Sequence, residues 1–184
     1  TMLFIARGGE KAPDGFRGQV LQGDAERVVC MSSTHIAMLD AIGAIESVVG
    51  VSGKDFITNP YIVANQHTIP DVGYDGNMNF ELLVAQQPDI VLLFGVTGAC
   101  VMESKLDELG IPYMYIGEYV EEDPLGKTEW LIAIAEIVGC RKHGITYFSE
   151  VPKRYEHLKS LAASAQTPTP KVMINTPYAD SWFM

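Results

Sequence analysis

The sequence has little positive charge and no long apolar run, and these two absences exclude several functions. Its 184 residues include 13 Lys and Arg against 23 Asp and Glu, a formal net charge of −10. Nucleic-acid binding depends on clusters of basic side chains that neutralise phosphates, so we expect no nucleic-acid partner. No segment has about twenty consecutive apolar residues, so we do not expect the chain to span a membrane.

Cysteine is also scarce. The three cysteines, Cys30, Cys100 and Cys140, have neither the Cys-x-x-Cys spacing of a metal site nor the even number of a disulfide framework. Cys30 lies in an apolar stretch, and we expect it to be buried. Cysteine usage leaves open both the cellular compartment and the disulfide state of all three residues.

The start of the chain lacks a signal peptide, which would have a charged segment, an apolar segment and then small residues. If the protein is exported, we expect its signal to have been removed ahead of Thr1. A content of 47% hydrophobic and 20% charged residues is typical of a globular protein. Within residues 1–23 we expect only a short edge strand at 2–6.

Short apolar runs alternate with helical patterns between residues 27 and 117. The predicted strands are 28–31, 48–51, 90–94 and 113–116, and the predicted helices follow Ser33 and occupy 80–87 and 102–109. Residues 54–70 read as irregular, with a turn signal at Asn59-Pro60. Strands joined through helices by short links favour an α/β fold with a mainly parallel sheet.

After Pro124 the pattern changes to two long helices, predicted at 125–138 and 143–163. Pro152 lies inside the second one, and because it removes a backbone hydrogen bond we expect a kink or a restart there. A strand is predicted at 172–175. We interpret this strand as the beginning of a second lobe whose remainder is absent; the alternative is a single-domain α/β protein in which the strand joins its own sheet.

The segment 79–93, NFELLVAQQPDIVLL, is the most informative motif. Asn79 suits the N-cap of a helix, and Glu81 would lie in the first turn, where the helix dipole favours a negative charge. Pro88 ends the helix, and the apolar strand follows. This segment resembles the Asn-x-Glu…Pro-Asp-hydrophobic segment of class III, or helical-backbone, substrate-binding proteins of ABC importers, which carry cobalamin, haem or ferric siderophores.

The resemblance extends along most of the chain. Residues 27–53, RVVCMSSTHIAMLDAIGAIESVVGVSG, resemble the family's first strand, first helix and second strand, and residues 105–117, KLDELGIPYMYIG, resemble its leucine, glycine, isoleucine-proline and strand element. Residues 124–165 resemble the helix that joins the two lobes, and residues 171–178, KVMINTPY, the strand that opens the second lobe.

The resemblance implies a domain order and a function. We expect an N-terminal extension at 1–23, a Rossmann-like substrate-binding lobe at 24–123, a linking helix region at 124–165 and the start of a truncated second α/β lobe at 170–184. The implied protein is not an enzyme and holds no covalent cofactor. It captures an iron or cobalt chelate and delivers it to permease subunits, in the periplasm or anchored at the cell surface as a lipoprotein.

Ligands of open parallel sheets bind beyond the carboxyl ends of the strands. Here that rule selects loops 32–35, 53–56, 95–98 and 117–119, together with 74–78, and the resemblance implies that they line the inter-lobe cleft. They supply hydroxyls, aromatic rings and few charges, which suits binding better than catalysis. The candidate ligand-binding residues are Ser33, Thr34, His35, Tyr74, Asp75, Asn77, Val96, Thr97 and Tyr119.

Other functions compete with this interpretation. His35 and His67 are candidate ligands for bare Zn or Mn in a protein of the same fold, although they form no close histidine pair. A non-transport cofactor-binding or enzyme domain would need cysteine ligands at strand ends, for which Cys100 is the one candidate. Ser33, Thr34 and His35 are poorly placed as a nucleophile and base because adjacent helix residues do not face one another. A third alternative is a protein-interaction domain that binds no ligand.

Glu81 has two interpretations. As a first-turn acid it would stabilise its helix by about 0.3–1 kcal/mol. The resemblance implies instead that the Glu of the Asn-x-Glu motif docks onto arginines of the permease, and we favour this second role.

Overall fold

The computed structural model describes residues 2–95, 101–165 and 170–172. Thr1–Pro152 form one compact unit and Lys153–Met184 a second one. The predicted strand at 172–175 and the predicted second-lobe segment at 170–184 lie almost entirely outside the described residues, so both stay predictions.

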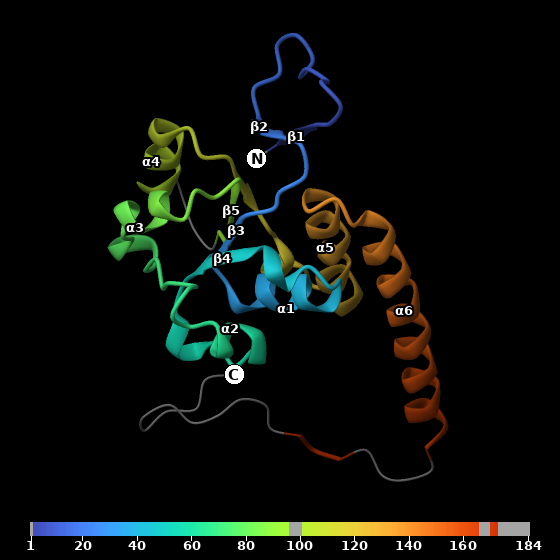
Figure 1. Cartoon of the computed structure of the whole chain (residues 1–184). Helices are drawn as coiled ribbons and strands as arrows, with labels where there is room; N and C mark the ends of the chain where they lie inside the picture. The colour runs from blue at the N-terminus through green and yellow to red at the C-terminus, as the bar shows by residue number, and fades with distance from the viewer. Residues whose placement is uncertain (1, 96–100, 166–169, 173–184) are drawn as a thin grey trace. The chain divides into compact units, whose positions relative to one another are not determined.

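The centre of the first unit is a sheet of four parallel strands in the order β4-β3-β5-β6 (Figure 1). The strands are β3 (Val28–Cys30), β4 (Val48–Val51), β5 (Ile90–Leu93) and β6 (Tyr113–Tyr115). This confirms the parallel α/β sheet predicted from the apolar runs. The chain adds β4 on one side of β3 and adds β5 and then β6 on the other, so the winding direction reverses between β3 and β5.

Alternate residues of the strands face two separate hydrophobic cores. Cys30 and Leu92 belong to the core that contains helices α1 and α5, whereas Val29 and Val91 belong to the core that contains α3 and α4. This alternation follows from the two-residue period of a strand and explains why the strands are apolar throughout. The helices are α1 (Ser33–Ala41), α3 (Phe80–Ala85), α4 (Val101–Leu109) and α5 (Pro124–Ile137).

The segment predicted to be irregular, 54–70, contains a short helix, α2 (Pro60–Ala64). Asn59 caps it, because its side-chain oxygen accepts hydrogen bonds from the amides of Tyr61 and Ile62 at 3.0 and 3.2 Å. The Asn-Pro pair is therefore a helix start and not only a turn signal. Single 3₁₀ turns complete the unit at η1 (Ile45–Ser47), η2 (Lys54–Phe56), η3 (Asp75–Asn77) and η4 (Glu118–Val120).

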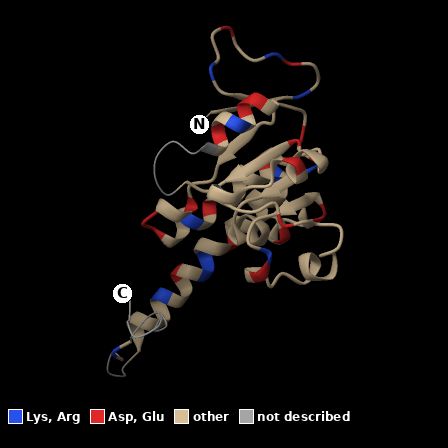
Figure 2. Cartoon of the chain, turned by 90° about the vertical axis from the view of Figure 1, so that its left-hand side faces the viewer, with Lys and Arg blue, Asp and Glu red and all other residues tan. Residues whose placement is uncertain are grey.

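The first residues form a second, smaller sheet. β1 (Leu3–Ala6) pairs in parallel with β2 (Gln19–Gln22), so the strand predicted at 2–6 is confirmed, while β2 was not predicted. The Gln19 side chain donates a hydrogen bond to Asp107 near the end of α4 at 3.1 Å. Since α4 leads into the amino end of β6, the small sheet lies toward the amino ends of the large one. Figure 2 shows Asp and Glu distributed over loops and helices, with Lys and Arg among them.

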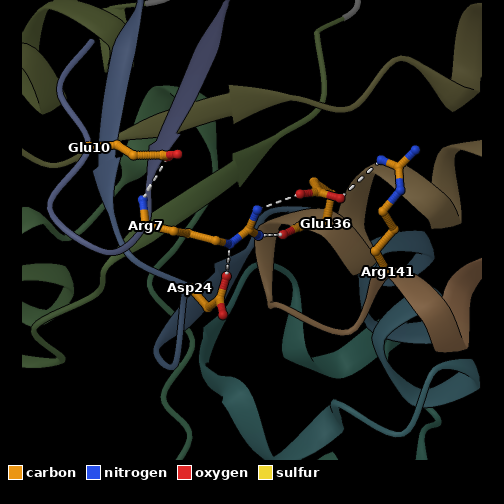
Figure 3. A network of polar contacts seen from close by, with 5 residues as sticks. All are labelled: Arg7, Glu10, Asp24, Glu136 and Arg141. Atoms are coloured by element: carbon orange, nitrogen blue, oxygen red, sulfur yellow. Dashed lines mark hydrogen bonds and ion pairs between the residues drawn. The ribbon is translucent and has the colours of Figure 1, made fainter.

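Arg7 ties this small sheet to the helical layer (Figure 3). Its guanidinium donates to Asp24 Oδ1 at 2.6 Å, to Glu136 Oε1 at 2.5 Å and to the Glu136 carbonyl at 2.6 Å. Arg141 donates to the other Glu136 oxygen at 3.0 Å. Hydrogen bonds from Arg7 and Arg141 lower the pKa of Glu136, and those to Glu136 and Asp24 raise the pKa of Arg7. Residues 1–23 are thus held at the carboxyl end of α5.

The second long helix, α6 (Arg141–Ser164), ends one residue after the predicted position. It runs through Pro152 as a single helix, so the predicted restart is wrong. Proline lacks one amide hydrogen, but the hydrogen bonds of the neighbouring turns are enough to continue the helix. The start of α6 packs closely on α5, since a Cβ at Gly144 would lie 2.5 Å from Ala135 Cβ.

Within the described ranges, no helix is long and apolar enough to span a bilayer. Cys30 is buried, as predicted; its thiol is free, and burial raises its pKa. Cys140 is a half-buried free thiol, whereas Cys100 lies outside the described residues.

Candidate functional site

The point where the strand order reverses, between β3 and β5, is where open α/β sheets bind ligands, beyond the carboxyl ends of the strands. We call the loops at this end the carboxyl-end face: residues 32–35 after β3, 52–58 after β4, 71–78 beside β4, 94–95 after β5 and 117–123 after β6. They include the loops that the sequence selects, as far as the structure describes them.

The first turn of α1 presents hydroxyl groups to this face. Ser32, not Ser33, is the N-cap: its backbone is extended, with φ −143° and ψ 146°, and its side chain accepts a hydrogen bond from the Thr34 amide at 3.3 Å. The Ser32 and Thr34 hydroxyls are also 2.8 Å apart, within hydrogen-bonding distance. The helix predicted to follow Ser33 therefore begins at Ser33 itself, which is exposed.

Glu118, which follows β6, contacts Thr34, which follows β3. The Thr34 hydroxyl donates a 2.5 Å hydrogen bond to Glu118 Oε1, which joins the loop after β6 to the start of α1. Glu118 is only 7% exposed, and its second oxygen, Oε2, is buried without a hydrogen-bond partner. The sequence did not reveal this residue, since an acid in a short loop is usually a solvated one. The one available signal was its position directly after a strand end.

His35 lies beneath the face, fully buried. Burial lowers its pKa to about 4, and the nearby Leu92 carbonyl opposes that shift. Neither ring nitrogen has a hydrogen-bond partner of good geometry. The imidazole is therefore neutral at pH 7. His67, the other histidine considered for a metal, is exposed after α2, and among the described residues no group of three or more His, Cys, Asp or Glu is arranged to hold a metal ion.

Large aromatic side chains stand exposed on four separate loops of the face. Their exposed fractions are 86% for Phe56, 63% for Tyr74, 45% for Phe94 and 63% for Tyr119. Tyr74 and Tyr119 were predicted as ligand-binding residues, whereas Phe56 and Phe94 were not. Phe94 directly follows a buried strand, so in the sequence it looks like one more strand residue. Exposed aromatic rings on several loops at one end of a sheet suit a binding surface.

A cavity of about 570 Å³ adjoins these loops. Its walls include Ser33 and Asp40 of α1, Phe56, Asn59 and Tyr147 of α6. The Asn59 amide donates a hydrogen bond to Asp40 at 3.0 Å and so links two of the walls. The cavity has room for a substituent of a ligand held on the face.

The remaining predicted residues are partly described. Asn77 is exposed in η3, where its amide donates to the Tyr74 carbonyl at 2.6 Å. Asp75 begins the same 3₁₀ turn. Val96 and Thr97 lie outside the described residues. The contact of any of these side chains with a ligand stays a prediction.

Glu81 lies at the start of α3. Asn79 caps this helix as predicted, accepting a hydrogen bond from the Leu82 amide at 2.9 Å. The Glu81 side chain is exposed, and no ion pair with a Lys or Arg among the described residues involves it. Its carboxylate is therefore available to a partner protein.

Comparison with known proteins gives the family. The uncharacterized lipoprotein MJ0878 of Methanocaldococcus jannaschii is 31% identical over 182 residues, which cover 94% of this chain and 42% of that protein. The periplasmic haem-binding protein of Pseudomonas aeruginosa matches in structure with a TM-score of 0.64 and 20% identity, over 77% of this chain and 48% of that one.

The periplasmic vitamin B12-binding protein BtuF of Vibrio cholerae matches with a TM-score of 0.59 and 19% identity, over 76% of this chain and 52% of that one. The chain thus spans about half the length of these proteins. Residues 28–183 match the periplasmic binding protein family. The chain belongs to the periplasmic binding protein family, with the helical-backbone, class III fold that its sequence resembles.

Proposed function

We propose that this chain is the first lobe and linking helix of a two-lobed substrate-binding protein that captures a cobalamin, haem or ferric-siderophore type of ligand. The observation that supports this most is the set of exposed aromatic rings on four loops of the carboxyl-end face. Flat macrocycles and the apolar parts of metal chelates pack well on aromatic rings, which bury a large area with few rotatable bonds. The names of the haem-binding and B12-binding structures agree with this ligand class.

Binding without catalysis fits the polar groups at the same face. Ser33 is exposed, but His35, two residues further on, is buried beneath the face, so the two do not form a nucleophile and base. The face offers hydroxyl groups and carboxylates, which can orient a ligand through hydrogen bonds. We therefore infer that the protein is not an enzyme and that its metal arrives and leaves as part of the chelate.

We also propose that the protein delivers its ligand to the permease of an ABC importer. The exposed Glu81 carboxylate at the start of α3 is available for a basic pocket of a partner, and an acidic protein gains from electrostatic steering toward such a pocket. The lipoprotein name of the Methanocaldococcus relative supports a location in the periplasm or at the cell surface.

A binding assay with the full-length two-lobed protein tests this function. Haemin, cyanocobalamin and a ferric trihydroxamate siderophore would each be titrated while tryptophan fluorescence is followed. Trp130 is a suitable reporter, because a Cβ at Gly117, the residue before η4, would lie 2.8 Å from its ring. We expect saturable, equimolar quenching by at least one chelate. If none of these chelates binds, the proposed function is wrong.

A further inference from the structure

The carboxyl-end face carries an excess of negative charge. The sequence of its loops has Asp75 and six other acidic residues, whose side chains the structure describes: Asp55, Asp71, Glu118, Glu121, Glu122 and Asp123. None of the ion pairs among the described residues involves these carboxylates. Asp71 and Asp123 accept hydrogen bonds from backbone amides, and Glu121 accepts one from the Trp130 indole, but no Lys or Arg that the structure describes neutralises their charge. An approaching ligand would therefore meet a negative charge.

The two basic side chains near this face are already engaged. Lys54 donates hydrogen bonds from Nζ to the carbonyls of Gln66 and Ile69. Lys127 donates from Nζ to the carbonyl of Tyr119 at 3.4 Å. Arg7 and Arg141, in contrast, pair with Glu136 at the carboxyl end of α5, close to the amino ends of the strands. Within residues 2–95 and 101–152, no guanidinium is in place to receive an anionic group of a ligand on the carboxyl-end face.

The Glu118 carboxylate holds part of the negative charge of the carboxyl-end face at a fixed position. Exposed carboxylates are screened by water and salt, whereas a buried charge acts over a longer distance. Glu118 is the one buried acidic side chain among the described residues, and its single hydrogen-bond donor is a neutral hydroxyl. It lies beside the Thr34 hydroxyl and precedes Tyr119 in the sequence.

We propose that the chelate presents uncharged, hydrogen-bond-donating groups to this lobe, such as the carboxamides of a corrinoid, and that chelates with carboxylates or other anionic groups bind less well. This inference rests on the proposed function and narrows it. The exposed residues Ser33, Thr34, Asp55 and Glu122 carry oxygen acceptors for the amide groups of such a ligand. A propionate of a porphyrin or a negatively charged ferric catecholate would meet the same groups as a like charge.

Two pairs of ligands test this with the full-length two-lobed protein. The first pair is cyanocobalamin and its monocarboxylic acid derivatives, in which one carboxamide is replaced by a carboxylate. The second pair is a neutral ferric trihydroxamate and a ferric triscatecholate with a charge of about −3. In the pair that binds, we expect the neutral member to bind about tenfold or more tightly, and added salt to strengthen only the anionic member's binding.

The variant Glu118→Gln tests whether this residue causes the preference for neutral ligands. Glutamine keeps an acceptor for the Thr34 hydroxyl but removes the charge, so the preference for the neutral ligand should fall several-fold. Glu108→Gln, on the exposed surface of α4, is the matched control and should leave it unchanged. This inference would be wrong if the anionic member bound equally or more tightly. It would also be wrong if Glu118→Gln left the preference unchanged and salt had no effect on binding to the wild type. Either result would leave the proposed function standing. Failure of all ligands to bind would overturn the proposed function as well.

Discussion

The Thr34 hydroxyl and the Glu118 carboxylate are joined by a 2.5 Å hydrogen bond although 84 positions separate them in the sequence. The bond connects the first turn of α1, which follows β3, to η4, which follows β6. It thus spans the point where the strand order reverses, and it links two loops of the candidate site.

Replacing Thr34 with Val should destabilise the fold. The variant keeps the shape of the side chain but leaves the buried Glu118 carboxylate without its donor, which costs about 1–3 kcal/mol of unfolding free energy. Urea denaturation measures the loss. Thr34→Ser retains the hydroxyl and should stay within about 0.5 kcal/mol of the wild type. Equal stability of the Val and Ser variants would show that the hydrogen bond contributes nothing.

His35 should make stability depend on pH. Its pKa is about 4 in the folded chain and 6.5 in the ordinary state, so the unfolded chain binds the proton more readily between these values. Stability therefore falls as the pH drops from 6.5 toward 4, by about 2 kcal/mol at pH 5. His35→Leu should remove this component, whereas replacement of the exposed His67 should not. Parallel pH profiles for wild type and His35→Leu would contradict the account.

Glu136 should also make stability depend on pH, in more acidic solution and by less than His35 does. Arg7 and Arg141 lower its pKa below the ordinary 4.5, so its stabilisation is present above that pH and is lost as the pH falls through the lowered pKa. Since both arginines are largely exposed, we expect Glu136→Gln to cost about 1 kcal/mol or less at pH 7 and nothing near pH 2. Chemical denaturation at the two pH values measures this. If Glu136→Gln lost more unfolding free energy at low pH than at pH 7, the prediction would be wrong.

The regular elements were predictable where the pattern was local. The four apolar runs gave the four strands of the parallel sheet, and Asn79 and Pro88 bracketed α3. β2 was missed because four residues, Gln19–Gln22, form a strand only by pairing with β1. α2 was missed because five residues are too few to show a helical period, although the Asn59 cap and Pro60 were visible.

The site was predictable only in outline. The rule for parallel sheets selected one end of the sheet and, within it, loops that the structure brings together. It did not show that His35 points into the core or that Glu118 reaches Thr34, because both facts depend on long-range packing. Phe94 was assigned to a strand for the same reason: its sequence neighbours are buried, and only the end of the sheet at Leu93 exposes it.

Glu81 should matter for transport and not for ligand affinity. In the full-length protein, Glu81→Lys should leave the dissociation constant of the ligand within about twofold, because the side chain is exposed and the proposed role is docking. Uptake through the cognate importer in cells should fall strongly. Weakened ligand binding with normal uptake at saturating ligand would reverse the assignment.

The exposed aromatic rings of the carboxyl-end face should hold the chelate. Isothermal titration of the full-length protein with the chelate that binds it, comparing Tyr119→Ala with Leu109→Ala, tests this directly. Leu109 is an exposed apolar residue at the end of α4, near the amino ends of the strands, and is the matched control. We predict about five- to tenfold weaker binding for Tyr119→Ala and no change for Leu109→Ala. Unchanged affinity in Tyr119→Ala, or an equal loss in both variants, would contradict the claim.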